Sequence, residues 1–288
     1  MTLKQLDRYT DRIDKAIRRI ETGIETDAIP DLGELADAAG MSEYHFHRIF
    51  RLLTGETAAQ AVKRARLSRS LPALSDGIME ATARSGYGSS QAYARALRAA
   101  IDLTPSQLRS DAELRENASR FFAEPKAETG PKDNPMRISI TSVEPLQLAI
   151  VHKVGDYSQL NSGFEQVFDE VINDSGEDAI GGLYGIPYDD PRSTDAERCR
   201  FDCAVSLTEH GDKTFRGARR TIEGGRALRL RHEGDYDRIH GVFDELYVEA
   251  MVSDHSISKR PVLVNYLDDP DTTPTDRLRA DIFLFLEA

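Results

Sequence analysis

The chain has 288 residues, of which 40% are hydrophobic and 30% are charged. This composition is typical of a globular protein, and the length predicts two domains, each large enough for its own core. The first residues, Met-Thr-Leu-Lys-Gln-Leu-Asp, contain no apolar run. We therefore expect no signal peptide, no membrane partner and a cytoplasmic location.

The cysteines exclude a disulfide framework. Cys199 and Cys203 are the only two in the chain. Four residues apart on an alternating apolar stretch, they would lie about 13 Å apart along a strand, which is too far for a disulfide. Reduced thiols fit a cytoplasmic protein, and no Cys or His spacing predicts a metal ion or another cofactor.

The net charge of −12 is unevenly distributed. Residues 1–110 hold 16 Lys and Arg against 14 Asp and Glu, a balance of +2, which leaves −14 for residues 111–288. The first part therefore tolerates a polyanion, whereas the second part repels one. An acidic second part is compatible with a cationic ligand, although a need for solubility explains it equally well.

Apolar residues at steps of three and four predict an amphipathic helix over residues 3–22, which we expect to end at Gly23. A helix-turn-helix is predicted next, over residues 31–55. Its first helix opens with a capping box, Asp31 with Glu34, and is interrupted by a glycine, after which Ser42 caps the second helix. The second helix is expected to present four side chains outward for base and phosphate contacts. These are Tyr44, His47, Arg48 and Arg51.

The same pattern returns after a long predicted helix at residues 57–71. Residues 78–98 repeat the order small residue, glycine, serine cap, aromatic residue and arginine, 47 residues later. The corresponding residues are Phe46, Arg48, Phe50 and Thr57 in the first unit and Tyr93, Arg95, Leu97 and Thr104 in the second. Two such units on one chain could enter successive major-groove segments of DNA without dimerisation.

These residues resemble the DNA-binding domain of the AraC/XylS family of bacterial transcription regulators over residues 5–110. The resemblance is carried by Ala36, Gly40, Ser42, Phe46, Arg48, Phe50, Gly55, Gly86, Ser89, Tyr93, Arg95, Thr104 and Pro105. It implies double-stranded promoter DNA as a partner, and it allows a contact with RNA polymerase. In the second unit the implied DNA-facing residues are Ser90, Gln91, Arg95 and Arg98. Any one of the eight DNA-facing residues could instead belong to a solvated helix face.

Further basic residues of the long helix, Lys63 and Arg64, are expected to hold phosphates. Residues 111–135 are polar and contain three prolines, which predicts a short helical tail followed by a flexible linker. Within that segment, Phe121 and Phe122 could dock on one of the domains.

Beyond the linker the apolar period changes to two, which predicts strands. A second repeat appears there, because Gly155-Asp156-Tyr157 recurs as Gly234-Asp235-Tyr236, 79 residues later. The same offset relates Asp189-Asp190-Pro191 to Asp268-Asp269-Pro270. We therefore predict an α+β C-terminal domain at residues 136–288, built from a duplicated strand-helix-strand-strand unit at about 136–210 and 220–288. The N-terminal domain, residues 1–110, is predicted to be all-α with two helix-turn-helix units.

The C-terminal half resembles the GyrI-like effector-binding domain, and the Rob-type regulators combine the two domains in this order. The resemblance is carried by residues 231–236 and 266–270. It implies a small, largely apolar or cationic effector in a central cleft. The acidic residue that relatives use for a cation stands two positions before the tyrosine of the Tyr-x-x-Asp-Pro segment, where this chain has Val264.

The predicted effector contacts are mainly aromatic. They are Tyr184, Tyr266, Asn265, Phe164, Phe243 and Tyr247, with Tyr157 and Tyr236 as further candidates. Core packing is an alternative for the phenylalanines and for Tyr247, which lie at helical spacing. For Asp202 and Asp281, at the start of the last strand of each repeat, we expect surface pairing with Arg200 and Arg279, and a role in ligand binding is the alternative.

An enzyme is not expected, and no catalytic residues are predicted, because the sequence has neither a phosphate-binding glycine loop nor a nucleophile elbow. A small-molecule hydrolase in the effector cleft is one alternative. Another is a module that modulates a partner protein while the N-terminal domain tethers it to DNA, but the arginine-bearing recognition helices argue against it.

Overall fold

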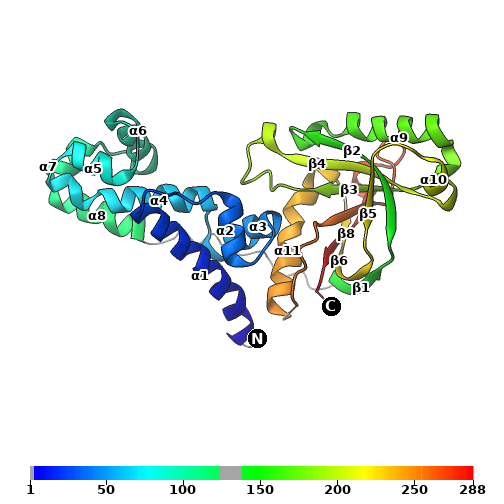
Figure 1. Cartoon of the computed structure of the whole chain (residues 1–288), viewed down its shortest axis with the longest axis horizontal. Coiled ribbons are helices and arrows are strands. Elements are labelled where there is room, and N and C mark those ends of the chain that lie inside the picture. Colours follow the sequence, from blue (N-terminus) through cyan, green and yellow to red (C-terminus); the bar gives the residue numbers. More distant parts are fainter. Residues whose placement is uncertain (1–2, 124–137, 254, 288) are drawn as a thin grey trace. The chain divides into compact units, whose positions relative to one another are not determined.

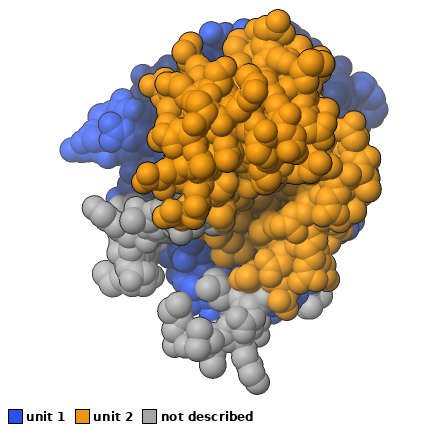
Figure 2. Space-filling view, turned by 90° about the vertical axis from the view of Figure 1, so that its left-hand side faces the viewer, with its two compact units in different colours: residues 1–9, 131–288 blue, residues 10–130 orange. Residues whose placement is uncertain are grey.

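The computed structural model describes residues 3–123, 138–253 and 255–287. Its contacts divide the chain into two compact units, which Figure 2 colours separately. We call Thr10–Gly130 the N-terminal unit, and Pro131–Ala288 together with Met1–Tyr9 the C-terminal unit. None of the helices in the described ranges has the length and apolar character needed to cross a bilayer.

The described part of the N-terminal unit is helical throughout, as the sequence predicts. Its helices are α1 (Leu3–Glu25), α2 (Leu32–Ala39), α3 (Glu43–Thr54), α4 (Ala58–Ser70), α5 (Ile78–Ser85), α6 (Ser90–Ile101), α7 (Pro105–Ser110) and α8 (Ala112–Ala123), with a short 3-10 helix at Pro72–Ser75. Helix α1 continues past Gly23, so the predicted end there is wrong. A Cβ atom on Gly23 would lie 2.5 Å from Cδ of Pro30, so this glycine permits a close approach of the following loop.

The caps of the two helix-turn-helix units follow the sequence signals. The Asp31 side chain accepts a hydrogen bond from the amide of Glu34, and the Glu34 carboxylate accepts one from the amide of Asp31. Gly40 and Gly86 end α2 and α5 in the left-handed conformation, with φ of 65° and 67°. Each tight bend therefore depends on a residue without a side chain.

Helix α8 belongs to the core of the N-terminal unit. Ala118 and Phe122 of α8 are buried in one cluster with Leu67, Tyr93 and Leu97 of the preceding helices. The predicted short helical tail after residue 111 is therefore confirmed, and the structure adds that this helix is packed into the core. The rest of the predicted linker, residues 124–135, lies outside the described residues.

The described residues of the C-terminal unit form one sheet of eight strands (Figure 1). The strand order is β1-β6-β8-β7-β3-β4-β2-β5. All seven neighbouring pairs in this order are antiparallel. The strands are β1 (Ile138–Val143), β2 (Leu146–Val154), β3 (Ile180–Pro187), β4 (Arg200–Leu207), β5 (Arg219–Ile222), β6 (Gly225–Glu233), β7 (Leu263–Tyr266) and β8 (Arg279–Phe285). The helices are α9 (Asn161–Ser175), α10 (Glu209–Thr214) and α11 (Ile239–Val252).

The strand order is symmetric about its centre. Strands β5 to β8 repeat the roles of β1 to β4, and each set of four encloses one long helix and its 3-10 turns. The first strand of each set pairs in the other half of the sheet, β1 with β6 and β5 with β2. At the centre, β3 pairs with β7 and Gly185 lies opposite Val264, its counterpart 79 residues later.

The 79-residue offset also relates individual contacts. The Tyr157 hydroxyl lies 2.6 Å from the Arg200 carbonyl, and the Tyr236 hydroxyl lies 2.8 Å from the Arg279 carbonyl. Both hydroxyls also donate to the first aspartate of the Asp-Asp-Pro turns, through its carbonyl oxygen. Each tyrosine therefore ties its 3-10 turn to the start of the last strand of its own half.

The aspartates that begin these strands do not pair as the sequence predicted. Asp202 lies 2.7 Å from His152 Nδ1, and Asp281 accepts two hydrogen bonds from Arg231, the residue at the position equivalent to His152. Arg200 and Arg279 bind the turn aspartates Asp189 and Asp268 instead. The physical reason is the geometry of strands. Residues 200 and 202 point to the same face of the sheet, but residues two apart along a strand are farther from each other than two residues that pair across neighbouring strands, such as His152 and Asp202.

Candidate DNA-reading helices and effector site

Helix α6 of the second helix-turn-helix has an open outer face. Ser89 caps its start by accepting a hydrogen bond from the amide of Ala92, and Tyr93 and Leu97 hold its inner face in the core. The predicted DNA-facing residues Gln91, Arg95 and Arg98 are exposed on the outer face, and Ser90 is half-buried beside Thr82. Two cations and one amide thus lie on the exposed outer face of α6.

Helix α3 of the first unit is less open than the sequence suggested. His47 and Arg51 are half-buried, whereas Tyr44 and Arg48 are buried, so the prediction that all four point into solvent is wrong for two of them. The Arg48 guanidinium lies over the Tyr44 ring, 5.4 Å from its centroid. A flat cation and an aromatic face attract each other, which accounts for their pairing. His45 is buried as well.

In the C-terminal unit, aromatic rings from both halves of the sheet form a continuous chain of contacts. The order is Phe243, His240, Tyr157, Phe201, Phe164, Tyr266 and Tyr236, with neighbouring centroids between 4.8 and 6.1 Å apart. We call these seven residues the aromatic cluster. Most of the contacts are edge-to-face, the geometry that aromatic pairs prefer.

The cluster lies on the sheet face that also carries Gly185 and Val264. A Cβ atom on Gly185 would lie 2.5 Å from the Phe201 ring and 3.1 Å from the Tyr266 ring, so the glycine leaves room for both rings at the centre of the sheet. Val264 lies opposite Gly185 and two residues before Tyr266, and it is buried. The centre of this face is therefore apolar.

Strand period divides the six predicted effector contacts between the two faces of the sheet. Asn265 pairs with Tyr184, whereas Tyr266 pairs with Leu183, and adjacent residues of a strand point to opposite faces. Tyr184 and Asn265 thus lie away from the aromatic cluster, which contains Phe164, Phe243 and Tyr266. Tyr247 is buried one turn after Phe243 on α11.

Burial is the largest cause of the pKa shifts at two groups near the cluster. It raises the pKa of the Tyr266 hydroxyl above its ordinary value and raises the pKa of the nearby Cys203 thiol to about 12. Both groups are therefore neutral near pH 7. None of the seven cluster members is acidic, so the cluster itself offers apolar surface and ring edges to a ligand.

Two members of the cluster were not predicted from the sequence, Phe201 and His240. Phe201 lies two residues before Cys203 on β4. The sheet face to which its side chain points can be assigned only when the register of β4 with β3 is known. His240 precedes Phe243 by three residues on α11, a spacing that places both side chains on one side of a helix.

Comparison with known proteins agrees with this division of the chain. Residues 136–287 match the GyrI-like small molecule binding domain, and residues 35–111 match a helix-turn-helix domain. The probable transcriptional regulator YgiV of Escherichia coli (strain K12) is 29% identical over 103 residues, which cover 35% of this chain and 64% of YgiV. The HTH-type transcriptional regulator Rv1931c of Mycobacterium tuberculosis is 33% identical over 81 residues, which cover 27% of this chain and 31% of Rv1931c.

Among solved structures, the cryo-EM structure of the EcmrR–DNA complex aligns with 90% of this chain and 99% of its own, at 15% identity and a TM-score of 0.46. The crystal structure of the EcmrR C-terminal domain aligns with 52% of this chain and 97% of its own, at 12% identity and a TM-score of 0.43. Because the matched domain at residues 136–287 makes up more than half of the sequence, this chain belongs to the GyrI-like small molecule binding domain family, with an AraC-type helix-turn-helix domain preceding that domain.

Proposed function

We propose that this protein is a sequence-specific DNA-binding transcription regulator whose C-terminal unit binds a small, largely apolar effector. The observation that carries the proposal is the combination of an exposed, arginine-bearing recognition helix with a GyrI-like domain on one chain. In this account α3 and α6 enter successive major-groove segments of a promoter. RNA polymerase is a further partner that such a position would allow.

Arg95 is the strongest candidate for a base contact, because it is exposed on the outer face of α6. An arginine in the major groove can donate two hydrogen bonds to a guanine. Arg48 occupies the equivalent position on α3, but it is buried, so a base contact by Arg48 requires that its side chain become exposed.

Selection from a random-sequence duplex library by the full-length protein tests this function. We expect a preferred sequence to emerge, and Arg95→Ala to weaken binding to it by about 1–3 kcal/mol. Arg84→Ala is the control, because Arg84 is exposed on α5 and pairs with Glu80 one turn away. Recovery of no preferred sequence would contradict a role in sequence-specific regulation.

For the effector we propose the aromatic cluster and the apolar centre of its sheet face. A neutral apolar ligand fits best, because Val264 supplies no charge where a carboxylate would complement a cation in a medium of low dielectric. We expect Val264→Glu to increase affinity for tetraphenylphosphonium, measured by calorimetry, relative to Val264→Gln. Equal affinities of the two variants would argue against an effector site at this position.

A further inference from the structure

Two arginines of α4, Arg64 and Arg66, contact different helix-turn-helix units. Residues two apart on an α-helix point about 200° away from each other, since each residue turns the helix by about 100°. Arg64 and Arg66 therefore extend from opposite sides of α4. Helix α4 connects the two helix-turn-helix units in the chain. An arginine on each of its sides can therefore contact a different unit.

Arg66 holds the bend of the second unit. Its Nε donates to the Ser85 carbonyl at 2.8 Å, its Nη2 donates to the Gly86 carbonyl, and its guanidinium lies 4.4 Å from the centroid of the Tyr87 ring. Both accepting carbonyls belong to the end of α5, where backbone oxygens lack helical partners. The fork of one guanidinium thus joins α4 to the bend between α5 and α6.

The first unit uses the same device. Nε of Arg12 on α1 donates to the Ala39 carbonyl at 2.7 Å, and its Nη2 donates to the Gly40 carbonyl. In both units an arginine of the preceding helix therefore binds the last helical carbonyl and the left-handed glycine after it. The recurrence at two independent bends argues that the contact positions the recognition helix that follows each bend.

Arg64 joins α4 to the end of the first recognition helix. Its guanidinium donates to both carboxylate oxygens of Glu56, at 2.7 to 3.1 Å, and to the Phe122 carbonyl at the end of α8. Glu56 follows Gly55, the cap of α3, and the Thr54 hydroxyl donates to the carbonyls of Phe50 and Glu56. Arg64 is thus committed to internal contacts, which contradicts its expected role in holding phosphate.

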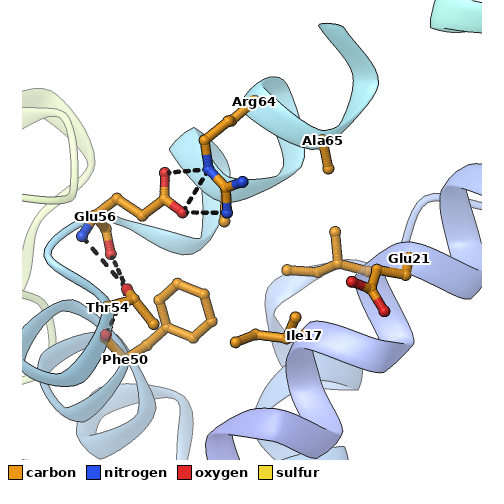
Figure 3. A pocket seen from close by; sticks show the side chains of 9 residues that line it. Ile17, Glu21, Phe50, Thr54, Glu56, Arg64 and Ala65 are labelled. Atoms are coloured by element: carbon orange, nitrogen blue, oxygen red, sulfur yellow. Dashed lines mark hydrogen bonds and ion pairs between the residues drawn. The ribbon is translucent and has the colours of Figure 1, made fainter. Parts of the chain in front are cut away.

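The Glu56–Arg64 pair is partly buried. The pair lies beside a cavity of about 70 Å³ between α1, α3 and α4. Figure 3 shows that Glu21 and Thr54 line this cavity together with apolar side chains. The side chains of Glu56 and Arg64 are only 11% and 26% exposed. Ion pairs at partly buried sites are screened less by salt than exposed pairs are.

We infer that Arg64 and Arg66 are positioning residues that set the spacing between the two recognition helices, and therefore the spacing of the half-sites that the protein accepts. The inference rests on the proposed function. Neither residue needs to touch DNA: one fixes α4 to the end of α3, and the other fixes α4 to the bend before α6. Loss of either contact should let the two reading units move relative to each other and relax the spacing requirement.

The test uses the full-length protein and a duplex that it selects from a random-sequence library, compared with derivatives carrying one or two extra base pairs between the half-sites. One added base pair moves a half-site by about 3.4 Å and rotates it by about 34°. We expect the wild-type affinity to fall about tenfold or more on insertion, and Arg66→Lys and Arg64→Lys to reduce that penalty at least about threefold. Lysine keeps the charge but has no fork with which to bind two carbonyls.

Arg84→Gln is the matched control, because it removes an exposed charge from a neighbouring helix. A lost phosphate contact weakens binding to every duplex alike and leaves the insertion penalty unchanged. Thermal unfolding curves of the two lysine variants and of Arg66→Gln show whether each variant is folded. A changed insertion penalty counts as a positioning effect only in a folded variant. An unchanged penalty in folded Arg64→Lys and Arg66→Lys would overturn the inference, whereas failure to select any duplex would overturn the proposed function itself.

Discussion

Gly185 and Val264 lie opposite each other at the centre of the sheet, although they hold equivalent positions in its two halves. Since β3 and β7 are antiparallel, this central pair marks the local twofold relationship between the halves. One partner lacks a side chain and the other is apolar. The asymmetry leaves space over Gly185 for the rings of Phe201 and Tyr266.

Gly185→Ala should therefore destabilise the protein. The new methyl group would overlap the Phe201 ring, and overpacking of this kind costs about 1–3 kcal/mol. Gly182→Ala on the same strand is the control, because its Cβ would be at an ordinary contact distance, 3.5 Å from the Tyr184 ring. Urea unfolding measures both variants, and equal stabilities would show that the glycine is not required by packing.

The equivalent tyrosines Tyr157 and Tyr236 should make similar contributions to stability. Tyr157→Phe and Tyr236→Phe each remove a hydroxyl that donates to backbone carbonyls at the Asp-Asp-Pro turn and the last strand. We expect a loss of about 0.5–1.5 kcal/mol in the free energy of unfolding for each variant. A loss in only one of the two, by urea unfolding, would contradict the equivalence of the turns.

Adjacent phenylalanines test whether α8 is part of the N-terminal core. Phe122 is 2% exposed and Phe121 is 43% exposed. Phe122→Ala should cost about 3–5 kcal/mol, the usual range for deleting a buried phenylalanine. Phe121→Ala should cost much less, and a comparable cost for the two changes, measured by chemical unfolding, would place the buried surface elsewhere.

Stability should fall at alkaline pH. Burial raises the pKa of the Cys203 thiol from 9.0 to about 12 and, with nearby aspartates, that of Cys199 to about 11. The folded state therefore retains protons that the unfolded chain has lost above pH 9. The stability that these neutral thiols contribute is present below pH 9 and is lost as the pH rises toward 12.

Cys203→Ser should flatten this decline in the free energy of unfolding between pH 9 and 11, relative to wild type. Removal of one titrating group lowers the slope by at most about 1.4 kcal/mol per pH unit. An identical slope in wild type and variant would show that the thiol titrates alike in the folded and unfolded chains.

Local signals in the sequence predicted the helical half well. The capping box at Asp31, the serine caps and the glycines at the bends act within a few residues, so their effects do not depend on distant packing. The 79-residue repeat likewise predicted the order strand, helix, strand, strand from β2 to β4 and from β6 to β8, but the predicted unit lacked the first strand of each half, β1 and β5. These features are local or periodic, and a single sequence displays both.

Contacts that depend on strand register could not be predicted. Tyr184 and Tyr266 appeared to belong to one site, but the pairing of β3 with β7 puts them on opposite faces. Asp202 binds His152 across the sheet instead of an arginine near it in sequence. The burial of Arg48 and the commitment of Arg64 to Glu56 are also tertiary effects, and no local pattern reports them.

Equilibrium competition between a selected duplex and random DNA for the full-length protein, at about 0.15 M salt, tests the central claim most directly. Specific regulators bind their sites about 10³-fold or more above random DNA under such conditions, and we predict a preference of at least that order. A protein that binds both duplexes equally, or neither, would contradict the assignment as a sequence-specific regulator.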